Sequence, residues 1–157
     1  MIINSQTEIN EIFASYYHTL YTDPNPPALE AVHQSIQDIR LACLGPERSK
    51  ELDEPLQLSE IKIAIRQISH NKAPGTDGLP MEYYASFVDT LASKLLELCN
   101  EAWQRGVLPP SLCEALIVVI HKAGRDPLDV RSCTPLSLLN TNYKILGKVL
   151  SNGLRPR

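Results

Sequence analysis

Residues 116–122 (LIVVIHK) are the one stretch of the chain with the pattern of a β-strand, a β-branched apolar run with charge at its end. A strand cannot satisfy its own backbone, because its N–H and C=O groups need a partner strand. Either a weaker strand elsewhere in the chain pairs with it, or the partner lies outside the sequence, which would make the chain a fragment. The other patterns are helical, so we predict a mainly α fold with a small β element (α+β).

Apolar residues recur at spacings of three and four over much of the remaining chain, which is the period of one helix face. The predicted helices are residues 8–22, about 28–44, a segment within 56–70 capped by Gln57 or Ser59, 80–88, 89–106 and 142 to about 151. Three prolines in residues 23–27 cannot continue a helix and mark a candidate hinge. Gly45-Pro46 is predicted to end the second helix, and Gly106 to follow the last turn of the fifth. Residues 123–135 are predicted to be a long loop.

The composition is that of a globular protein, with 157 residues, 43% of them hydrophobic and 21% charged. No apolar run approaches the roughly 18 to 20 residues that span a bilayer, and the N-terminus lacks the pattern of a signal peptide. We therefore expect an intracellular protein, in the nucleus or the cytoplasm, with no membrane partner. The four cysteines and four histidines are scattered, so we expect no structural metal site and no disulfide scaffold.

Charge is distributed unevenly along the chain. Residues 1–104 carry a net charge of −8, whereas residues 105–157 carry +5. A surface that binds phosphate should therefore lie in the last third of the chain. Ordinary solvated faces would give the same counts, so charge alone leaves both interpretations open.

Residues 71–80 (NKAPGTDGLP) are rich in turn-forming residues. Pro74-Gly75 suits the central positions of a type II turn, and Asp77 can cap a helix that begins near residues 79–80. Gly78 lets the chain swing tightly into that helix. These residues favour a structural role for the loop. Lys72 is the exception, because its ammonium could reach a phosphate, although a lone loop lysine is usually just solvated.

The end of the predicted strand is a second candidate site. Lys122, with a glycine and Arg125 close behind, could hold a polyphosphate, the lysine as a point charge and the arginine as a fork. Asp126 and Asp129 lie in a proline-containing loop with no apolar strand beside them, so we do not expect them to bind metal. Neither a Walker motif nor GxSxG, HExxH or GxGxxG occurs, and no complete active site is predicted.

Taken in order, four segments resemble the reverse transcriptase domain of LINE-type non-LTR retrotransposons. FASYYHTLYTD (13–23) resembles the F-x-x-Y-Y-x-x-L-Y that precedes the polymerase, and SEIKIAIRQISHNKAPGTDGLPMEYY (59–84) resembles E-I-x-x-A-I followed by K-x-P-G-x-D-G-L-P-x-E-F-Y. NEAWQRGVLPPSLCEALIVVIHKAGRDP (100–127) is similar to G-x-L-P-x-S followed by I-x-L-I-x-K-x-G-K-D-P. CTPLSLLNTNYKILGKVLSNGL (133–154) is similar to Y-R-P-I-S-L-L-N-x-D-Y-K-I-L-A-K-x-L-A-x-R-L.

This resemblance implies part of an RNA-directed DNA polymerase. It implies a helical segment before the polymerase (1–54) and the N-terminal fingers of a right-hand polymerase (55–157), which grip the template RNA and the incoming dNTP. By the resemblance, Lys122 matches the lysine associated with the triphosphate, and Arg125 and Lys72 are candidate nucleotide- or template-binding residues. The family's K-x-P-G-x-D-G loop matches Lys72 together with Pro74, Gly75, Asp77 and Gly78. The implied partners are an RNA template and a DNA primer or target.

The sequence departs from the family pattern at Thr134, Asn142 and Gly153, where the family has arginine, aspartate and arginine. Threonine cannot replace the phosphate-gripping fork of an arginine. The family's catalytic aspartates lie in a palm, in a strand motif and a Y-x-D-D hairpin, and this sequence ends before either. We expect a truncated, degenerate fingers fragment with no catalytic residue, metal ligand or cofactor of its own, and Mg²⁺ for the full-length family enzyme.

The chain alone is therefore predicted to be inactive as a polymerase, and its binding of RNA and DNA to be weak or absent. Two alternatives stay open, namely a residual RNA- or DNA-binding module and a purely structural helical remnant.

Overall fold

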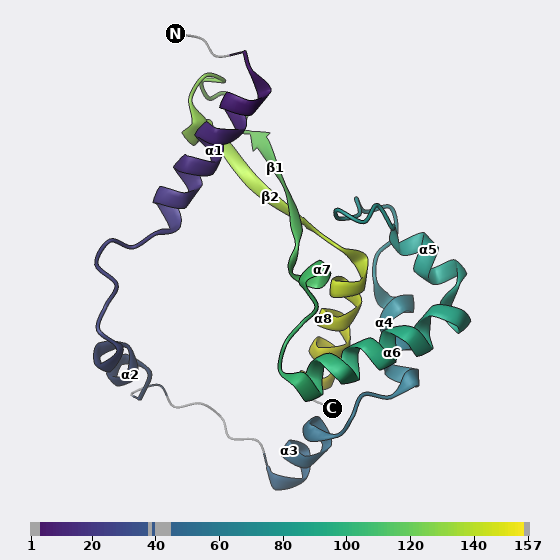
Figure 1. Ribbon diagram of the computed structural model, residues 1–157. Helices are drawn as coiled ribbons and strands as arrows, with labels where there is room; N and C mark the ends of the chain where they lie inside the picture. The colour runs from purple at the N-terminus through teal and green to yellow at the C-terminus, as the bar shows by residue number, and fades with distance from the viewer. Residues whose placement is uncertain (1–3, 38, 40–44, 156–157) are drawn as a thin grey trace. The chain divides into compact units, whose positions relative to one another are not determined.

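The computed structural model describes residues 4–37, 39 and 45–155 of the chain (Figure 1). Its helices are α1 (Gln6–Tyr21), α2 (Leu29–Gln37), α3 (Pro46–Asp53), α4 (Leu58–Gln67), α5 (Met81–Ser86), α6 (Val88–Arg105), α7 (Pro110–Cys113), α8 (Thr141–Leu154) and the short 3-10 helix η1 (Val130–Ser132). Two strands, β1 (Ala115–His121) and β2 (Cys133–Leu139), pair in a small antiparallel sheet. The predicted fold class, mainly α with a small β element, is confirmed.

The partner of the predicted strand lies within the chain. β2 covers CTPLSLL, which the sequence pattern had placed in a loop and before a helix. Pro135 in its middle weakens the strand pattern, because proline cannot donate to a ladder. In a two-stranded sheet each strand has a free edge, so Pro135 can face that edge without costing a hydrogen bond.

The chain forms two compact units, which we describe separately. The tip unit combines the described residues of Met1–Leu44 with Val119–Thr134, and the helical unit combines Gly45–Val118 with the chain from Pro135 onward. Both units are thus assembled from segments distant in sequence. The expected organisation into residues 1–54 and 55–157 stays a prediction.

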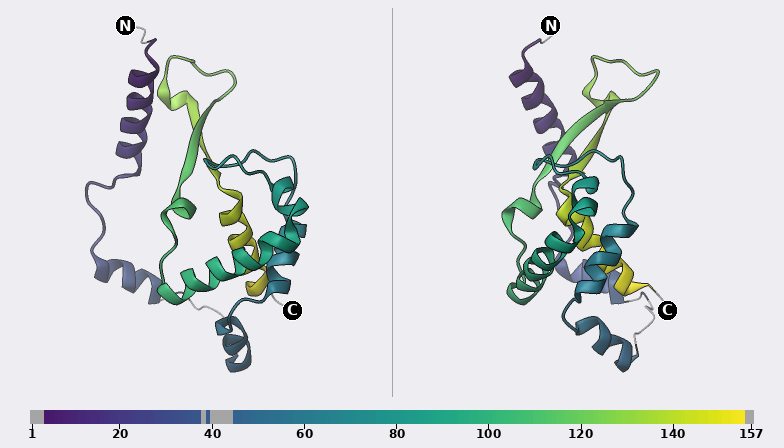
Figure 2. Two further views of the ribbon diagram at one scale, coloured as in Figure 1. Left: turned by 45° about the vertical axis from the view of Figure 1, so that its right-hand side comes forward. Right: turned by 90° about the vertical axis from the view of Figure 1, so that its right-hand side faces the viewer.

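The core of the helical unit is built by α4, α5, α6 and α8 (Figure 2). α4 packs against α8, α6 and α5. The buried apolar side chains are Ile61, Ala64, Ile65, Met81, Tyr84, Ala92, Leu95, Cys99, Ile145, Leu146 and Val149. Their spacing of three and four on each long helix is the predicted one, and burying each large side chain stabilises the fold by about 1.5–3 kcal/mol.

The ends of several helices follow from local hydrogen bonds. The Glu60 carboxylate accepts the Gln57 N–H at 2.8 Å, which caps α4 at the predicted position. Gly106 ends α6 with a left-handed φ of 65°, as predicted. α3 was not predicted, because its sequence PERSKELD has no apolar face; Pro46 occupies its first turn, a position at which proline is tolerated. The predicted end of the second helix at Gly45-Pro46 stays a prediction, since residues 40–44 lie outside the described residues.

The second predicted helix is confirmed as α2 as far as Gln37. Of its predicted remainder, positions 38 and 40–44 lie outside the described residues.

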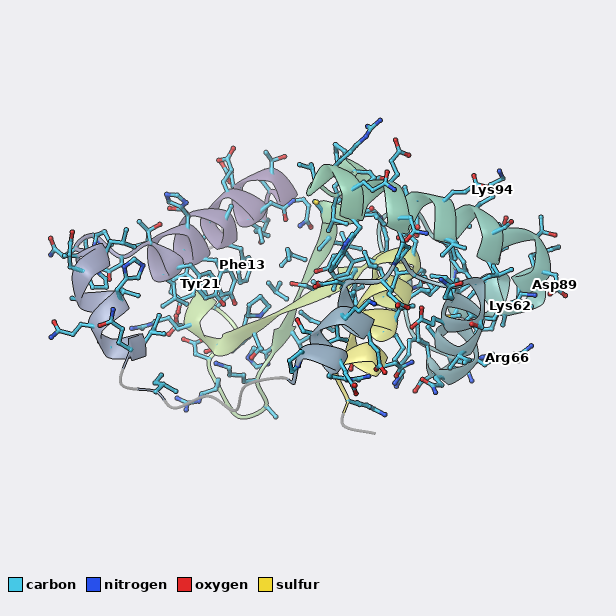
Figure 3. The ribbon with its side chains drawn as sticks, turned by 90° about the horizontal axis from the view of Figure 1, so that it is seen from below. Phe13, Tyr21, Lys62, Arg66, Asp89 and Lys94 are labelled. Carbon is cyan, nitrogen blue, oxygen red and sulfur yellow. The ribbon has the colours of Figure 1, made fainter. Side chains whose placement is uncertain are left out.

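On the exposed side of the helical unit, the Lys62 ammonium of α4 lies 2.7 Å from the Asp89 carboxylate of α6 (Figure 3). This ion pair holds the pKa of Asp89 below its usual range.

In the tip unit, α1 packs beside η1. The Tyr17 hydroxyl donates to the Cys133 carbonyl at 3.1 Å. Phe13, Tyr17 and Tyr21 form a row of stacked rings with centroids 6.4 and 6.1 Å apart, and Figure 3 labels the two ends of that row. The predicted helix 8–22 is confirmed as α1, and Tyr17 is the member of its aromatic row that bonds Cys133. Among the described helices, none combines the length and the apolar character needed to cross a membrane.

Candidate nucleotide- and template-binding loops

The loop 71–80 connects α4 to α5, and its turn differs from the predicted one. The turn runs from Gly75 to Gly78, with the Gly78 N–H donating to the Gly75 carbonyl at 3.2 Å. Gly78 has a φ of 69°, as its predicted tight swing requires, but Gly75 does not have a positive φ. A type II turn needs a positive φ at its third residue, so the prediction for Pro74-Gly75 was wrong.

Gly75 is instead required by a close approach. A Cβ atom at this buried position would lie 2.1 Å from the Asn140 side-chain oxygen and 2.5 Å from the Asn140 backbone nitrogen. No side chain fits at such distances. Backbone contact with the start of α8, and not turn geometry, explains this glycine.

Asn140 is the central residue of the loop's surroundings, and it was missed at the sequence level as a functional candidate. It is 2% exposed. Its Oδ1 accepts from the Thr76 hydroxyl and the Asp77 N–H, both at 3.3 Å, and its Nδ2 donates to the Ser111 carbonyl at 2.9 Å. The one available signal was its place in the LLN block just before a helix, a position that favours a cap and says nothing of a distant loop.

Asp77 does not cap α5. Its carboxylate accepts the Leu79 N–H at 3.0 Å, which forms a local turn of the kind asparagine and aspartate favour. α5 begins at Met81 with Pro80 at its N-cap and no side-chain cap. The predicted cap is thus wrong, because the helix starts too late for Asp77 to reach its first amides. The Thr141 hydroxyl donates to the Leu79 carbonyl at 2.7 Å and fixes the end of the loop.

The start of the loop is held from α5 and α8. Asn71 has a left-handed φ of 57°, and its N–H donates to the Glu82 carboxylate at 2.6 Å. This hydrogen bond is the main cause that holds the pKa of Glu82 below its usual range. The Lys144 ammonium donates to the Ala73 carbonyl at 3.2 Å. Lys72 lies between these two anchored residues, and its own side chain is exposed.

Lys122 and Arg125 lie together at the tip of the hairpin. The Lys122 N–H donates to the Ser132 carbonyl at 2.8 Å, and the Arg125 N–H donates to the Lys122 carbonyl at 3.2 Å. Gly124, with a φ of 74°, permits the turn between them. The Lys122 ammonium makes one long contact, 3.4 Å, to the Arg131 carbonyl. The two cations are therefore exposed on one tight turn, as a site for phosphate needs.

The two aspartates of the tip make local bonds. Asp126 accepts the Leu128 N–H at 2.9 Å. Asp129 receives the Arg131 side chain at 2.9 and 3.0 Å, and this pairing lowers the pKa of Asp129 and raises that of Arg131. Within residues 4–37, 39 and 45–155, no group of three or more His, Cys, Asp or Glu side chains is arranged to hold a metal ion.

The predicted site residues are divided between the two compact units. Lys122 and Arg125 belong to the tip unit, whereas Lys72 and its loop belong to the helical unit. Of the positions that depart from the family pattern, Thr134 is exposed on β2, and the Asn142 side chain accepts the Tyr143 N–H at 2.8 Å. The Gly153 carbonyl accepts from the Arg48 guanidinium of α3.

Comparison with known proteins identifies relatives that cover most of the chain. It is 34% identical over 141 residues to the transposon TX1 uncharacterized 149 kDa protein of Xenopus laevis, which covers 90% of this chain and 10% of that protein. It is 29% identical over 150 residues to the RNA-directed DNA polymerase from mobile element jockey of Drosophila melanogaster, covering 94% of this chain and 16% of that protein. The jockey polymerase of Drosophila funebris is 32% identical over 99 residues, covering 63% of this chain and 11% of that protein.

No protein-family model matches the chain. It spans between a tenth and a sixth of the length of its first two relatives. Both the ordered motifs and the relatives lead to the same family, and the chain belongs to the proteins of LINE-type non-LTR retrotransposons.

Proposed function

We propose that the chain is the fingers part of a retrotransposon RNA-directed DNA polymerase, in which residues 55–157 grip the template and the incoming dNTP. The observation that carries the proposal is the pair of exposed cations on the hairpin turn, Lys122 and Arg125, joined by a 3.2 Å backbone hydrogen bond. The neighbouring Asp129 carboxylate is paired with the Arg131 guanidinium at 2.9 Å and not with either of these two cations. The activity for which the jockey relatives are named supports the same class of ligand.

Lys72 is the third proposed contact, to a phosphate of the template strand. Its loop matches the family motif, and its ammonium is exposed on a backbone anchored on both sides. The residues Pro74, Gly75, Asp77 and Gly78 are proposed to shape this loop and not to touch the ligand. Residues 1–54 are proposed to form the helical segment that precedes the polymerase.

Binding measurements with charge-removing variants test the proposal. Labelled oligoadenylate RNA and a fluorescent dNTP are titrated against the chain and its Lys122→Ala and Arg125→Ala variants. Either substitution should weaken binding about tenfold or more, since a hydrogen bond to a charged group contributes about 1.5–3 kcal/mol. The slope of log K for RNA binding against log salt concentration should also become less steep, by about 0.7 for each phosphate contact removed.

Lys94→Ala is the matched control, because Lys94 is an exposed lysine whose ammonium pairs with Glu97 at 3.0 Å. This substitution should leave the affinities for the RNA and for the dNTP unchanged. If Lys122→Ala and Arg125→Ala bind as the parent chain does, the proposed grip is wrong. If the two variants lose RNA binding and neither they nor the parent chain bind the dNTP, the residual nucleic-acid-binding module is favoured. The net charge of +5 on residues 105–157 fits that alternative.

We further propose that the chain alone does not polymerise DNA. Two-metal phosphoryl transfer needs carboxylates free to converge on the ions. Asp126 and Asp129, the two carboxylates of residues 122–132, make local bonds to Leu128 and Arg131, and among the described residues they do not belong to a group of three or more possible ligands, so they do not fit a Mg²⁺ ligand role. Primer extension on poly(rA)/oligo(dT) with Mg²⁺ should give no incorporation above a heat-denatured control; incorporation would refute this proposal.

A further inference from the structure

We propose that Asn140 is a positioning residue for Lys72, holding the loop 71–79 in the shape in which the Lys72 ammonium meets a phosphate of a nucleic-acid strand. The inference rests on the proposed function of Lys72. It assigns a role to a residue whose side-chain hydrogen bonds go to Thr76, Asp77 and Ser111 and not to Lys72 itself.

The first support is the way Asn140 uses its side chain. Although Asn140 is the N-cap residue of α8, its side chain makes no cap hydrogen bond to that helix. Its amide instead joins two segments distant in sequence, the turn at Thr76-Asp77 and the Ser111 carbonyl. Because a buried amide left unpaired is strongly unfavourable, these hydrogen bonds keep the loop in one place.

The second support is the tight contact on the opposite side of the same group. Gly75 approaches Asn140 so closely that not even a methyl group would fit between them. The loop therefore cannot move toward α8, and the hydrogen bonds to Asn140 keep it from moving away. Together they define a single distance between the loop and the start of α8.

The third support is that the backbone on both sides of Lys72 is anchored, whereas the Lys72 side chain is not. Backbone groups of Asn71, Ala73 and Leu79 are bound by Glu82, Lys144 and Thr141. Among the described residues, no hydrogen bond or ion pair involves the Lys72 ammonium, and Lys72 is exposed. A mobile cation on a fixed backbone loses less conformational freedom on binding than one on a flexible loop, which is the advantage of preorganisation.

A double-mutant cycle tests the coupling between the two residues. Binding of labelled oligoadenylate RNA is measured for the full chain and for Lys72→Ala, Asn140→Ala and the double variant. Lys72→Ala should weaken binding about tenfold, and Asn140→Ala by a similar factor. The double variant should bind within about twofold of Lys72→Ala, since Asn140 acts through Lys72.

Asn152→Ala provides the matched control. Asn152 lies on the same helix, and its amide bonds the exposed Gln67 side chain at 2.8 Å, so binding should be unchanged. Circular dichroism and urea midpoints establish that each variant is folded. Thr76→Val is a milder change, because it removes only one hydrogen bond to Asn140. We expect it to weaken RNA binding about two- to threefold in the parent chain and to have no effect when it is combined with Lys72→Ala. If Asn140→Ala does not fold, the Thr76→Val pair decides the question.

The outcomes separate the inference from the function on which it rests. Suppose that Lys72→Ala weakens binding but Asn140→Ala has no effect, or that the loss in the double variant equals the product of the two single losses. The positioning role is then overturned, and Lys72 keeps its proposed function. If Lys72→Ala has no effect, the proposed function of Lys72 fails, and the positioning role fails with it.

Discussion

Gly75 shows how one residue can be fixed by a partner far along the chain. A methyl group at Gly75 would collide with Asn140, whereas a methyl group at Gly147, within α8, would meet nothing within 4 Å. We expect Gly75→Ala to lower the free energy of unfolding by about 1–3 kcal/mol, the usual range for overpacking. Gly147→Ala should raise it by about 0.5–1 kcal/mol, because glycine is a poor helix former.

Urea denaturation followed by circular dichroism measures both changes. The opposite signs are the critical result, since two glycine-to-alanine changes in one compact unit differ only in their surroundings. Equal stabilities for the two variants would show that the loop does not contact α8 at Gly75.

Tyr84 gives a prediction for alkaline pH. It is 5% exposed, and burial, with a smaller contribution from the Asp77 charge, raises the pKa of its phenol from 10.0 to about 12. The fold therefore favours the neutral phenol. The resulting stability is fully present below about pH 10 and is lost as the pH rises from there to about 12.

Tyr84→Phe should flatten this alkaline loss by an amount on the order of 2 kcal/mol, because each pKa unit corresponds to about 1.4 kcal/mol. Some loss should remain, since burial also raises the pKa values of Tyr17 and the Cys99 thiol. Urea midpoints between pH 8 and 12 measure the effect, with the 74% exposed Tyr21→Phe as control. An unaltered pH profile in Tyr84→Phe would contradict the assignment.

At the scale of elements, α4 is the helix on which the helical unit depends. Ile61 is completely buried between its neighbours, whereas Ile63, on the same helix, is 46% exposed. Ile61→Ala should lower the free energy of unfolding by about 2–5 kcal/mol through reduced burial and the cavity left behind. Ile63→Ala should change it by less than about 1 kcal/mol. Thermal or urea unfolding measures the stability of both variants. Similar losses of stability would contradict the burial of Ile61 and the exposure of Ile63 on α4.

The helices with an apolar stripe could be predicted from the sequence, because a period of three and four is a local property. α3 could not, because PERSKELD carries no such stripe and is stabilised by its proline start and by Arg48, which reaches the Gly153 carbonyl. β2 was missed for a related reason, since Pro135 interrupts its pattern and its apolar run leads directly into α8. The strand forms because β1 supplies the partner.

The cations of the candidate site could be found from sequence, because lysine and arginine at turns are visible as residue types. Their supports could not. Asn140, Thr141 and Lys144 act on a much earlier loop, through hydrogen bonds between residues 62 to 71 positions apart. No local pattern records such pairs, so the turn type and the cap at residues 74–77 were assigned wrongly.

At the scale of the whole molecule, two compact units share one chain. Within the tip unit, the Tyr17 hydroxyl bonds the Cys133 carbonyl and so joins α1 to the base of the hairpin loop. We expect Tyr17→Phe to cost the tip unit about 0.5–1.5 kcal/mol, the net value of one hydrogen bond. Amide hydrogen exchange should accelerate in α1 and around η1 and stay unchanged in α4, α6 and α8. Faster exchange throughout both units would show that they open together.

The hairpin has a consequence for how the protein behaves at high concentration. Leu116, Ile117 and Ile120 of β1 and Leu136 of β2 are between 45% and 54% exposed, and each strand has an edge with unpaired backbone groups. Such a ribbon is a template for strand addition between molecules. The apparent molecular mass from light scattering should therefore increase with protein concentration, and Ile117→Lys should suppress the increase by placing a charge on that surface. The same two-stranded ribbon that satisfies the strand pairing within one molecule would then limit the concentration at which the protein stays monomeric.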